Sequence, residues 1–460
     1  MNMKYMNIMS EIKNQIIAGT LKAGDKIPSI RYLSEKYGYS KNTVLKAYEE
    51  LEKLHVIYSI PKSGYFVVHD SHLSTNTCNQ NKIDFLSAGP DKRALPYKDV
   101  QHCMNQAIDL YKEELFTYSD EQGLLSLRQE LVNHLQNNQV FTAAERVFIT
   151  SGSQQALNLL VQMPFPNGKS NILIEQPSYF GIVESVQVHD ITTFGIDLTM
   201  DSIDLDRLEN MFRNNDIKFF YVIPRFHNPL GHSYTNEQKK KIVELANKYD
   251  VYIVEDDIFG DLDYNHKIDP MFAFDPSGRV IYIKSFSKVM LPGLRIGLTV
   301  LPELMIHSFR RFKFSEDLFS PSISQGALEI YLKSGMFNSH IHHIRDMYRR
   351  KMELAIAACR DYLLATASFT EPATGFYLSI YLPKTVHSKR LAQSLQQENI
   401  LVDQADRMFL PEYRKGNLIR LCLSQVDEEQ IRPGIEKIAA HIEAISKKQV
   451  HFIEEANRLI

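Results

Sequence analysis

The sequence has few of the residues that mark secreted, membrane or metal-binding proteins. Its four cysteines, Cys78, Cys103, Cys359 and Cys422, are too scattered for a metal site or a disulfide framework. No apolar run approaches the roughly 20 residues that a membrane span requires, and the N-terminal residues do not resemble a signal peptide. We therefore expect reduced thiols, no metal, no membrane partner and a cytoplasmic location.

The chain also has little excess charge of either sign. Its net charge is −3, with 44% hydrophobic and 23% charged residues, which is typical of a globular protein. Residues 1–70 contain ten Lys/Arg against seven Asp/Glu, so this end carries +3 and the rest carries −6. The positive sign suits contact with phosphates, although a solvated surface often carries as much.

The first 69 residues have the pattern of a winged helix-turn-helix. Three segments show the apolar spacing or the caps of helices: residues 5–18, 30–37 and 41–54. Ser29 and Ser40 can cap the last two, with a turn at Gly38 between them. The β-type runs 57–60 and 65–68 then predict a hairpin wing. We predict a DNA-binding domain of α+β class over residues 1–69.

The third of these helices carries candidate DNA contacts. Val44, Ala47, Tyr48 and Leu51 occupy core-facing positions, so the polar residues lie on other faces. The candidates are Arg31, Ser40, Lys41, Asn42, Thr43 and Lys46, with Lys62 from the wing. Residues at the start of a recognition helix commonly reach base edges, and lysines contact phosphates. A solvated helix surface is the alternative, but the wing favours DNA binding.

The rest of the chain predicts an α/β protein. Residues 70–83 are polar and without periodicity, so we interpret them as a linker that spans roughly 20 Å on average. Apolar runs then alternate with helical segments, which predicts a largely parallel sheet; the runs are 147–150, 172–175, 219–223, 251–255 and 280–283. Within residues 84–460 we expect a large part over about 115–304 and a smaller α+β part over about 305–460.

Residues 285–297, SFSKVMLPGLRIG, are the most informative stretch of the chain. Lys288 can hold pyridoxal 5'-phosphate as an imine, while Ser285, Ser287 and Arg295 can bind its phosphate through hydroxyl and guanidinium groups. A lone lysine after a strand is usually a surface residue, but this string is too long to match by chance.

A second segment can complete the phosphate site. Ser151, Gly152, Ser153 and Gln154 follow an expected strand and open a helix, so their backbone N–H groups and the helix dipole can meet an anion. An ordinary capped helix is the alternative. The pairing of this segment with Lys288 favours the phosphate site.

Three further residues suit the cofactor ring. Tyr179 can stack on the pyridine face, Asn228 can donate to the ring oxygen, and Asp256 can keep the ring nitrogen protonated. Each has a simpler alternative: a core aromatic, an Asn-Pro turn and a helix cap, a role for which Asp257 is better placed. Arg225 could touch a distal group of a ligand, but a surface arginine is the simpler interpretation.

These motifs resemble the MocR/GabR family of pyridoxal-phosphate-dependent transcription regulators. Residues 5–69 resemble the winged helix-turn-helix of GntR-type regulators, and residues 84 to about 445 resemble a fold-type I aminotransferase of class I. The resemblance implies that Tyr118 reaches the phosphate of a partner subunit and that Arg420 grips a ligand carboxylate. It also implies a homodimer, arranged head to tail, in which each DNA-binding domain rests on the other subunit.

One residue departs from the family pattern. Many relatives have a tyrosine three positions after the acid at the ring nitrogen, and its hydroxyl also bonds the ring oxygen; here the residue is Phe259. We expect the loss of this donor to change the titration of the imine.

The sequence thus predicts a regulator that binds a double-stranded DNA operator and senses an amino compound through pyridoxal phosphate on Lys288. Two alternatives stay open. The chain could be an active aminotransferase with an autoregulatory DNA-binding head, or it could sense pyridoxal phosphate itself.

Overall fold

The structure, a computed structural model, describes residues 3–22, 24–53, 56–60, 63–67, 82–199, 202–264 and 268–458. The chain divides into two compact units, an N-terminal unit of residues 1–82 and a body of residues 83–460. No helix in these described ranges is long and apolar enough to cross a membrane. Lys62 and almost all of the expected linker lie outside the described residues.

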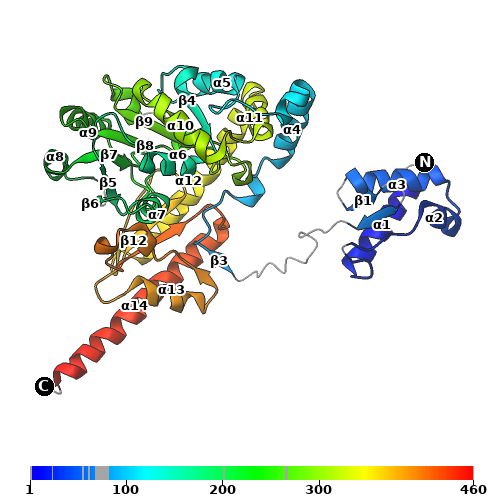
Figure 1. Cartoon of the computed structure of the whole chain (residues 1–460). Helices are drawn as coiled ribbons and strands as arrows, with labels where there is room; N and C mark the ends of the chain where they lie inside the picture. The colour runs from blue at the N-terminus through cyan, green and yellow to red at the C-terminus, as the bar shows by residue number, and fades with distance from the viewer. Residues whose placement is uncertain are drawn as a thin grey trace. The chain divides into compact units, whose positions relative to one another are not determined.

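The N-terminal unit contains a helix-turn-helix and a hairpin (Figure 1). Its elements are α1 (Met3–Ile17), α2 (Ile30–Tyr37), α3 (Lys41–Lys53), β1 (Ile57–Ile60) and β2 (Gly64–Val67). The two strands pair antiparallel, from Ile57 opposite Val67 to Ile60 opposite Gly64. The predicted winged helix-turn-helix is therefore confirmed.

Local chemistry explains where α2 and α3 begin and end. Ser29 Oγ accepts the Tyr32 N–H at 3.2 Å, and Ser40 Oγ accepts the Thr43 N–H at 3.2 Å, so both predicted caps are formed. Gly38 ends α2 with φ +61°, a left-handed conformation that glycine adopts without steric cost. The apolar faces of the helices and the hairpin then enclose one core, which includes Ile8, Ile12, Leu33, Val44, Tyr48 and Val67.

The body is built on a seven-stranded sheet, counted over the described residues, with strand order β4-β10-β9-β8-β7-β5-β6. Strands β9, β8, β7, β5 and β6 run parallel to one another, whereas β10 runs antiparallel to both β9 and β4. The bounds are β4 (Val147–Thr150), β5 (Asn171–Gln176), β6 (Thr193–Asp197), β7 (Ile217–Val222), β8 (Tyr252–Asp256), β9 (Val280–Ser285) and β10 (Gly297–Val300).

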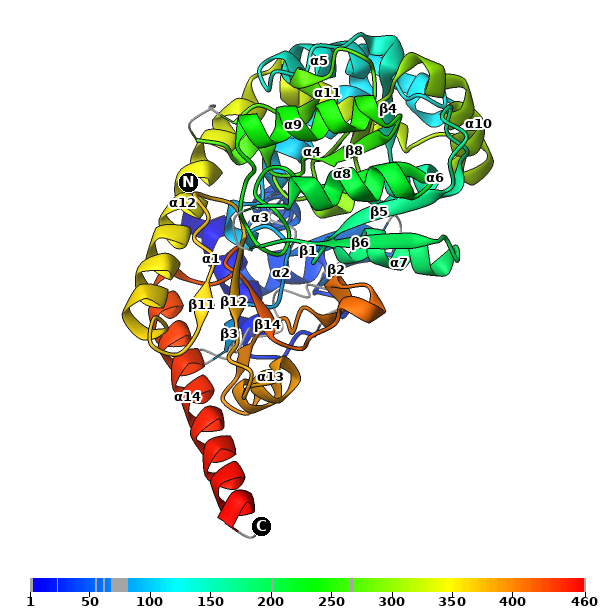
Figure 2. The ribbon, with the colours of Figure 1, turned by 90° about the vertical axis from the view of Figure 1, so that its left-hand side faces the viewer.

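Helices cover both faces of this sheet (Figures 1 and 2). Successive strand residues point to opposite faces: Ile172 and Ile174 pack with α6, α7 and α10, whereas Leu173 packs with α8 and α9. Helices α4, α5 and α11 pack against β4, β9 and β10. The bounds are α4 (Tyr97–Tyr111), α5 (Leu125–Gln136), α6 (Ser153–Gln162), α7 (Phe180–Val188), α8 (Leu205–Asn214), α9 (Asn236–Lys248), α10 (Ile306–Asp317) and α11 (Ser322–Lys333).

A smaller α+β part completes the body. Its antiparallel sheet has the order β11-β12-β14, and a parallel pair joins β13 to β3. Helix α12 lies beside α14 and links the two parts (Figure 2). The bounds are β3 (Ile83–Asp84), β11 (Ser368–Phe369), β12 (Tyr377–Tyr381), β13 (Ile400–Leu401), β14 (Leu418–Cys422), α12 (Met336–Tyr362), α13 (Ser388–Gln396) and α14 (Glu428–Arg458).

The structure confirms the α/β fold class and changes two details. The smaller part was expected to begin near residue 305, but Phe309 and Tyr331 pack in the cores of the large sheet. Only from about Met352 do the side chains of α12 join the core of the smaller part. In addition, strands β6 and β10 were not expected.

Candidate functional site

Residues that follow the carboxyl ends of the strands converge on one cavity of about 1240 Å³. Parallel strands end at the same edge of a sheet, so loops far apart in sequence meet there. The predicted residues that line the cavity are Gly152, Ser153, Gln154, Tyr179, Asn228, Asp256, Ser285, Ser287, Lys288, Arg295 and Arg420. The sequence motifs of the body therefore belong to one place in the fold.

Lys288 projects from the loop after β9 and is half-buried. Its Nζ donates a hydrogen bond to the Ala88 carbonyl oxygen at 2.6 Å. Burial lowers the pKa of Lys288 to about 8, while Cys422 raises it and the Arg420 charge lowers it to a smaller extent. The amine is therefore neutral, and so nucleophilic, closer to physiological pH than an ordinary lysine.

Asp256 ends β8 at the floor of the cavity. Its Oδ2 accepts a hydrogen bond from Tyr221 at 2.7 Å, and its Oδ1 is buried without a partner among the described residues. Burial raises the pKa of Asp256 to about 7; the Tyr221 bond opposes this rise and the Asp257 charge adds to it. A cationic N–H donor from a ligand would satisfy the free oxygen and favour the ionised carboxylate.

The loop before α6 and the loop after β9 form a polar cradle. Gly152 has φ +82°, and a Cβ there would lie 2.7 Å from Arg295 Nη2, so a side chain at this position would displace the arginine. Arg295 Nη2 donates to the Ser151 carbonyl oxygen at 3.1 Å. Ser287 Oγ is buried without a partner within the described structure. A guanidinium, a free hydroxyl and the start of α6 can together bind a phosphate dianion.

Arg420, on β14, also lines the cavity and is only 1% exposed. It donates through Nη1 to Asn228 Oδ1 at 3.1 Å and through Nη2 to Asp403 Oδ2 at 2.7 Å. Since arginine is only a donor, the first bond fixes the amide oxygen of Asn228 and leaves its Nδ2 to donate to a ligand. The Arg420 guanidinium also lies 4.6 Å from the centre of the Tyr377 ring.

The first residues of the body, residues 83–91, run from β3 to the cavity; we call this segment the N-terminal strap. Besides the bond from Lys288 to Ala88, the Gly89 carbonyl oxygen accepts from Ser424 Oγ at 2.6 Å. The Asp91 N–H donates to Tyr348 Oη at 3.0 Å, and Asp91 Oδ2 accepts from Lys351 Nζ at 2.8 Å.

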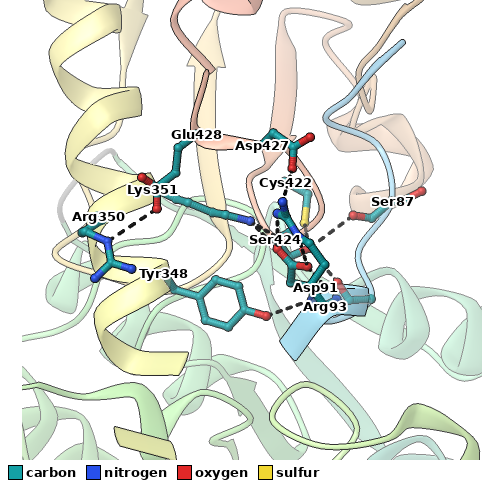
Figure 3. Close-up of polar contacts among 11 residues, drawn as sticks. Ser87, Asp91, Arg93, Tyr348, Arg350, Lys351, Cys422, Ser424, Asp427 and Glu428 are labelled. Atoms are coloured by element: carbon teal, nitrogen blue, oxygen red, sulfur yellow. Dashed lines mark hydrogen bonds and ion pairs between the residues drawn. The ribbon is translucent and has the colours of Figure 1, made fainter. Parts of the chain in front are cut away.

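Figure 3 shows that Tyr348 and Lys351 of α12 contact Asp91, whereas Ser424, which follows β14, contacts the strap at Ser87. Burial alone would raise the pKa of Asp91, but the Arg93 and Lys351 bonds hold it well below the usual range. The strap is thus fixed by both parts of the body.

Several predicted residues lie elsewhere. Tyr118 is 87% exposed and does not line the cavity of its own chain. Ser151 does not line the cavity either; its backbone carbonyl oxygen accepts from Arg295, and its N–H donates to Gln155 Oε1 at 2.8 Å. The ring of Phe259 is fully buried against Phe376, 5.0 Å between centres, and it too does not line the cavity.

Arg225 corrects one expectation, because it is buried rather than on the surface. It forms a two-bond ion pair with Asp257, in which Nε lies 2.9 Å from Oδ1 and Nη2 contacts Oδ2. Tyr282 also donates to Asp257, at 2.5 Å. Asp257 is therefore the partner of a buried arginine and not a helix cap.

The candidate DNA contacts lie on the surface of the N-terminal unit. Ser40, Lys41, Asn42 and Lys46 are exposed and Thr43 is half-buried. Arg31 is exposed and pairs with Glu35 at 3.0 Å. Lys46 Nζ lies 5.0 Å from the centre of the Tyr5 ring. Lys62 lies outside the residues that the structure describes.

Sequence reasoning missed several residues that line the cavity. Ala88, Tyr377, Asp403 and Arg407 all do so. Ala88 acts through its backbone carbonyl, which every residue type has, so the identity of this residue could not indicate its role. Asp403 could not be recognised either, because its contact with Arg420 depends on an isolated backbone pairing between two separate segments of the chain.

Two family models match the chain. The model for bacterial regulatory proteins of the gntR family matches residues 4–67, and that for aminotransferases of class I and II matches residues 91–438. The HTH-type transcriptional regulator YcxD of Bacillus subtilis (strain 168) is 44% identical over 443 residues, which cover 95% of this chain and 100% of that protein. NorG, an HTH-type transcriptional regulator of Staphylococcus aureus (strain USA300), is 27% identical, covering 91% and 100%.

Solved structures of aminotransferases resemble the body. Kynurenine aminotransferase of Pyrococcus horikoshii is 26% identical with a TM-score of 0.74, covering 79% of this chain and 91% of that one. The multiple substrate aminotransferase of Thermococcus profundus is 26% identical with a TM-score of 0.75, covering 80% and 93%.

Proposed function

Because this chain belongs to the GntR-type transcription regulators that carry an aminotransferase-like domain, the MocR type of architecture, we propose that pyridoxal phosphate on Lys288 couples an amino compound to operator binding. The observation that carries the proposal is the convergence of Lys288, Asp256 and the Gly152–Arg295 cradle on one cavity. Residues 1–69, within the N-terminal unit, form the operator-binding domain, and residues 84–460 sense the ligand.

The residues of the cavity fit pyridoxal phosphate. The free Oδ1 of Asp256 suits a protonated ring nitrogen, and the free Ser287 hydroxyl and Arg295 suit the phosphate. Lys288 supplies the amine that would hold the aldehyde carbon, Asn228 Nδ2 would donate to the ring oxygen, and Tyr179 would cover the ring face. When bound, the cofactor supplies an electrophilic carbon that exchanges one amine for another.

The residues of the cavity would transfer protons and orient the ligand. The lowered pKa of Lys288 lets it release and accept protons near neutral pH. Arg420 and Asn228 lie together on the wall of the cavity and would orient the acid group of an incoming amino compound.

The N-terminal strap offers a route from this chemistry to the operator-binding domain. Ala88 accepts a hydrogen bond from Lys288 Nζ, and the strap begins directly after the linker that follows the N-terminal unit. Any ligand that changes the bonding of Nζ therefore changes a contact of the strap. A ligand biases operator affinity only as far as it favours one arrangement of this segment over another.

Association into a homodimer completes the proposal. Leu110, Phe116 and Tyr118 are apolar or aromatic and exposed, on α4 and the segment after it, which is typical of a surface that another chain covers. We propose a head-to-tail homodimer in the cytoplasm, in which Tyr118 reaches the phosphate of the partner subunit.

Reduction with borohydride tests the cofactor assignment. Treatment of the pyridoxal-phosphate-loaded protein should fix the cofactor to one peptide, the one that contains Lys288, and Lys288→Ala should remove the label. Lys240→Ala, which changes an exposed lysine on α9, is the matched control and should keep it. Label on another lysine, or no label, would contradict the proposal.

A panel of amines separates this proposal from an active aminotransferase and from a sensor of the cofactor itself. Absorbance, keto acid and affinity for an operator selected from random DNA are measured in parallel. A spectral change with altered DNA affinity and no keto acid supports the regulator. Multiple turnovers without a change in DNA affinity would favour the enzyme, and a response to the cofactor alone would favour the sensor.

A further inference from the structure

We propose that Asp403 sets the ligand specificity of the cavity. Its carboxylate already binds the Arg420 guanidinium, and this weakens the preference of the site for amines that carry a carboxylate. This inference rests on the proposed function, since it concerns the ligand of the same cavity. It predicts that the site accepts amino compounds with and without a carboxylate.

The charge of Arg420 is already compensated by a neighbouring carboxylate. Asp403 Oδ2 lies 2.7 Å from Arg420 Nη2, and the two side chains are 4% and 1% exposed. A ligand carboxylate on the same guanidinium would lie beside the Asp403 carboxylate. Like charges on one partner oppose each other, and in a buried site water screens this repulsion poorly.

Asp403 is held in place by backbone hydrogen bonds. Its Oδ1 accepts the Ala405 N–H at 3.1 Å, and its backbone exchanges two hydrogen bonds with Arg420, at 2.8 and 3.2 Å. Its position opposite the arginine is therefore built into the pairing of the chain next to β14. The carboxylate of a ligand must therefore compete with the Asp403 carboxylate, which is already held in position.

A second arginine, Arg407, also contacts Asp403. Arg407 Nη2 lies 2.9 Å from the same Asp403 oxygen, and its side chain is 54% exposed at the cavity. Because Arg407 and Arg420 share the Asp403 carboxylate, each arginine is compensated only in part. The net charge of the three side chains is one positive charge, so the site can still bind an acid, but more weakly than an unpaired arginine would.

Specificity is a difference between two affinities, so the test uses pairs of ligands that differ only in the carboxylate. We choose L-alanine against ethylamine and L-phenylalanine against phenylethylamine, titrated by absorbance into the cofactor-loaded protein. Asp403→Asn should raise the preference for the amino acid by about tenfold or more, because one negative charge next to the ligand is lost. Asp406→Asn is the matched control: it removes a charge from the cavity wall, and no bond joins that side chain to Arg420 in the described structure.

A second pair of variants keeps the test valid if Asp403→Asn does not fold. Arg407→Gln leaves Asp403 to Arg420 alone and should lower the preference severalfold, whereas Lys389→Gln, an exposed cation of the same cavity, should change it by less than about twofold. Equal effects of Asp403→Asn on both members of a pair would overturn the inference. So would equal effects of Arg407→Gln and Lys389→Gln.

An experiment without cofactor separates this inference from the proposed function. Acetate, against chloride at equal ionic strength, should raise the thermal midpoint of cofactor-free Asp403→Asn more than that of the wild type. If no variant bound pyridoxal phosphate, the proposed function would fail, and this acetate difference would still support the role of Asp403. Equal shifts in the two proteins would overturn the inference alone.

Discussion

The two units place their candidate functional residues in opposite ways. In the N-terminal unit, the candidates that the structure describes come from two consecutive helices and the cap between them, and nearly all of them are exposed. In the body, residues as far apart as Ala88 and Arg420 line one cavity, and many of their polar atoms are buried and bonded to one another.

This difference has energetic consequences. An exposed side chain that is not bound to a partner contributes little to the stability of the folded protein, so its loss affects binding alone. A buried charge that loses its partner destabilises the protein by several kcal/mol, because the remaining charge stays away from water. We therefore expect substitutions in the body to have large, coupled effects and those in the N-terminal unit to have small, additive ones.

The largest effect is expected at the N-terminal strap. Lys351→Met removes a buried partner of Asp91, 2.8 Å away, and should lower the free energy of unfolding by about 3 kcal/mol. Arg93 remains bonded to Asp91 and limits the loss. Urea unfolding measures the change, and Lys447→Met, on an exposed pair of α14, is the control. Equal stabilities of the two variants would remove the contrast between buried and exposed charges.

The next effect is expected at Asp256. Asp256→Asn replaces a carboxylate by a neutral amide and should raise the Kd for pyridoxal phosphate about 30-fold, the value of a charge-assisted hydrogen bond. Fluorescence titration of the cofactor-free protein measures it. Asp197→Asn, on the partly exposed end of β6, should bind like the wild type. Unchanged affinity in Asp256→Asn would place the ring nitrogen elsewhere.

The pH dependence of cofactor attachment should reveal the burial of Lys288. Its pKa is lowered to about 8, so the amine loses its proton as the pH rises through 8 rather than through the usual 10.4 or so. Because only the neutral amine attacks, the rate of attachment should rise about tenfold between pH 7 and pH 9 and then level off. Stopped-flow absorbance measures this rate. A rate that keeps rising tenfold per pH unit to pH 10 would show an ordinary, solvated lysine.

The smallest effects are expected in the N-terminal unit. Lys41→Ala and Lys46→Ala should each weaken operator binding about threefold to tenfold and reduce the slope of log affinity against log salt by about one. Lys41 should matter more, since Lys46 also interacts with the Tyr5 ring. Fluorescence anisotropy at several salt concentrations measures both, with Lys240→Ala as control. An unchanged salt slope would mean that neither lysine contacts a phosphate.

What the sequence could predict follows the same division. The helices of the N-terminal unit begin at Ser29 and Ser40 because a serine cap is a local interaction, readable from a few residues. The apolar runs of the buried parallel strands are equally readable. Strand β6 was missed because Gly195 interrupts it, and β10 because it begins at Gly297, inside the 285–297 stretch that was interpreted only as the cofactor site.

The site could be predicted where a motif carries the chemistry, as at Lys288 and Asp256. It could not be predicted where the chemistry depends on register between distant segments. The bond from Lys288 to Ala88, the pair of Arg225 with Asp257, and the Asp403 carboxylate on Arg420 all arise in this way. Long-range packing, not local pattern, determines these contacts.

The most direct test measures whether an amine changes operator affinity through Lys288. The affinity of the cofactor-loaded protein for a selected operator is determined with and without the amine that changes its absorbance, in the wild type and in Lys288→Ala. We expect a shift of at least about fivefold in the wild type, a typical coupling between sites, and none in Lys288→Ala. Equal shifts in both proteins, or a bound amine that leaves the wild-type affinity unchanged, would contradict this expectation.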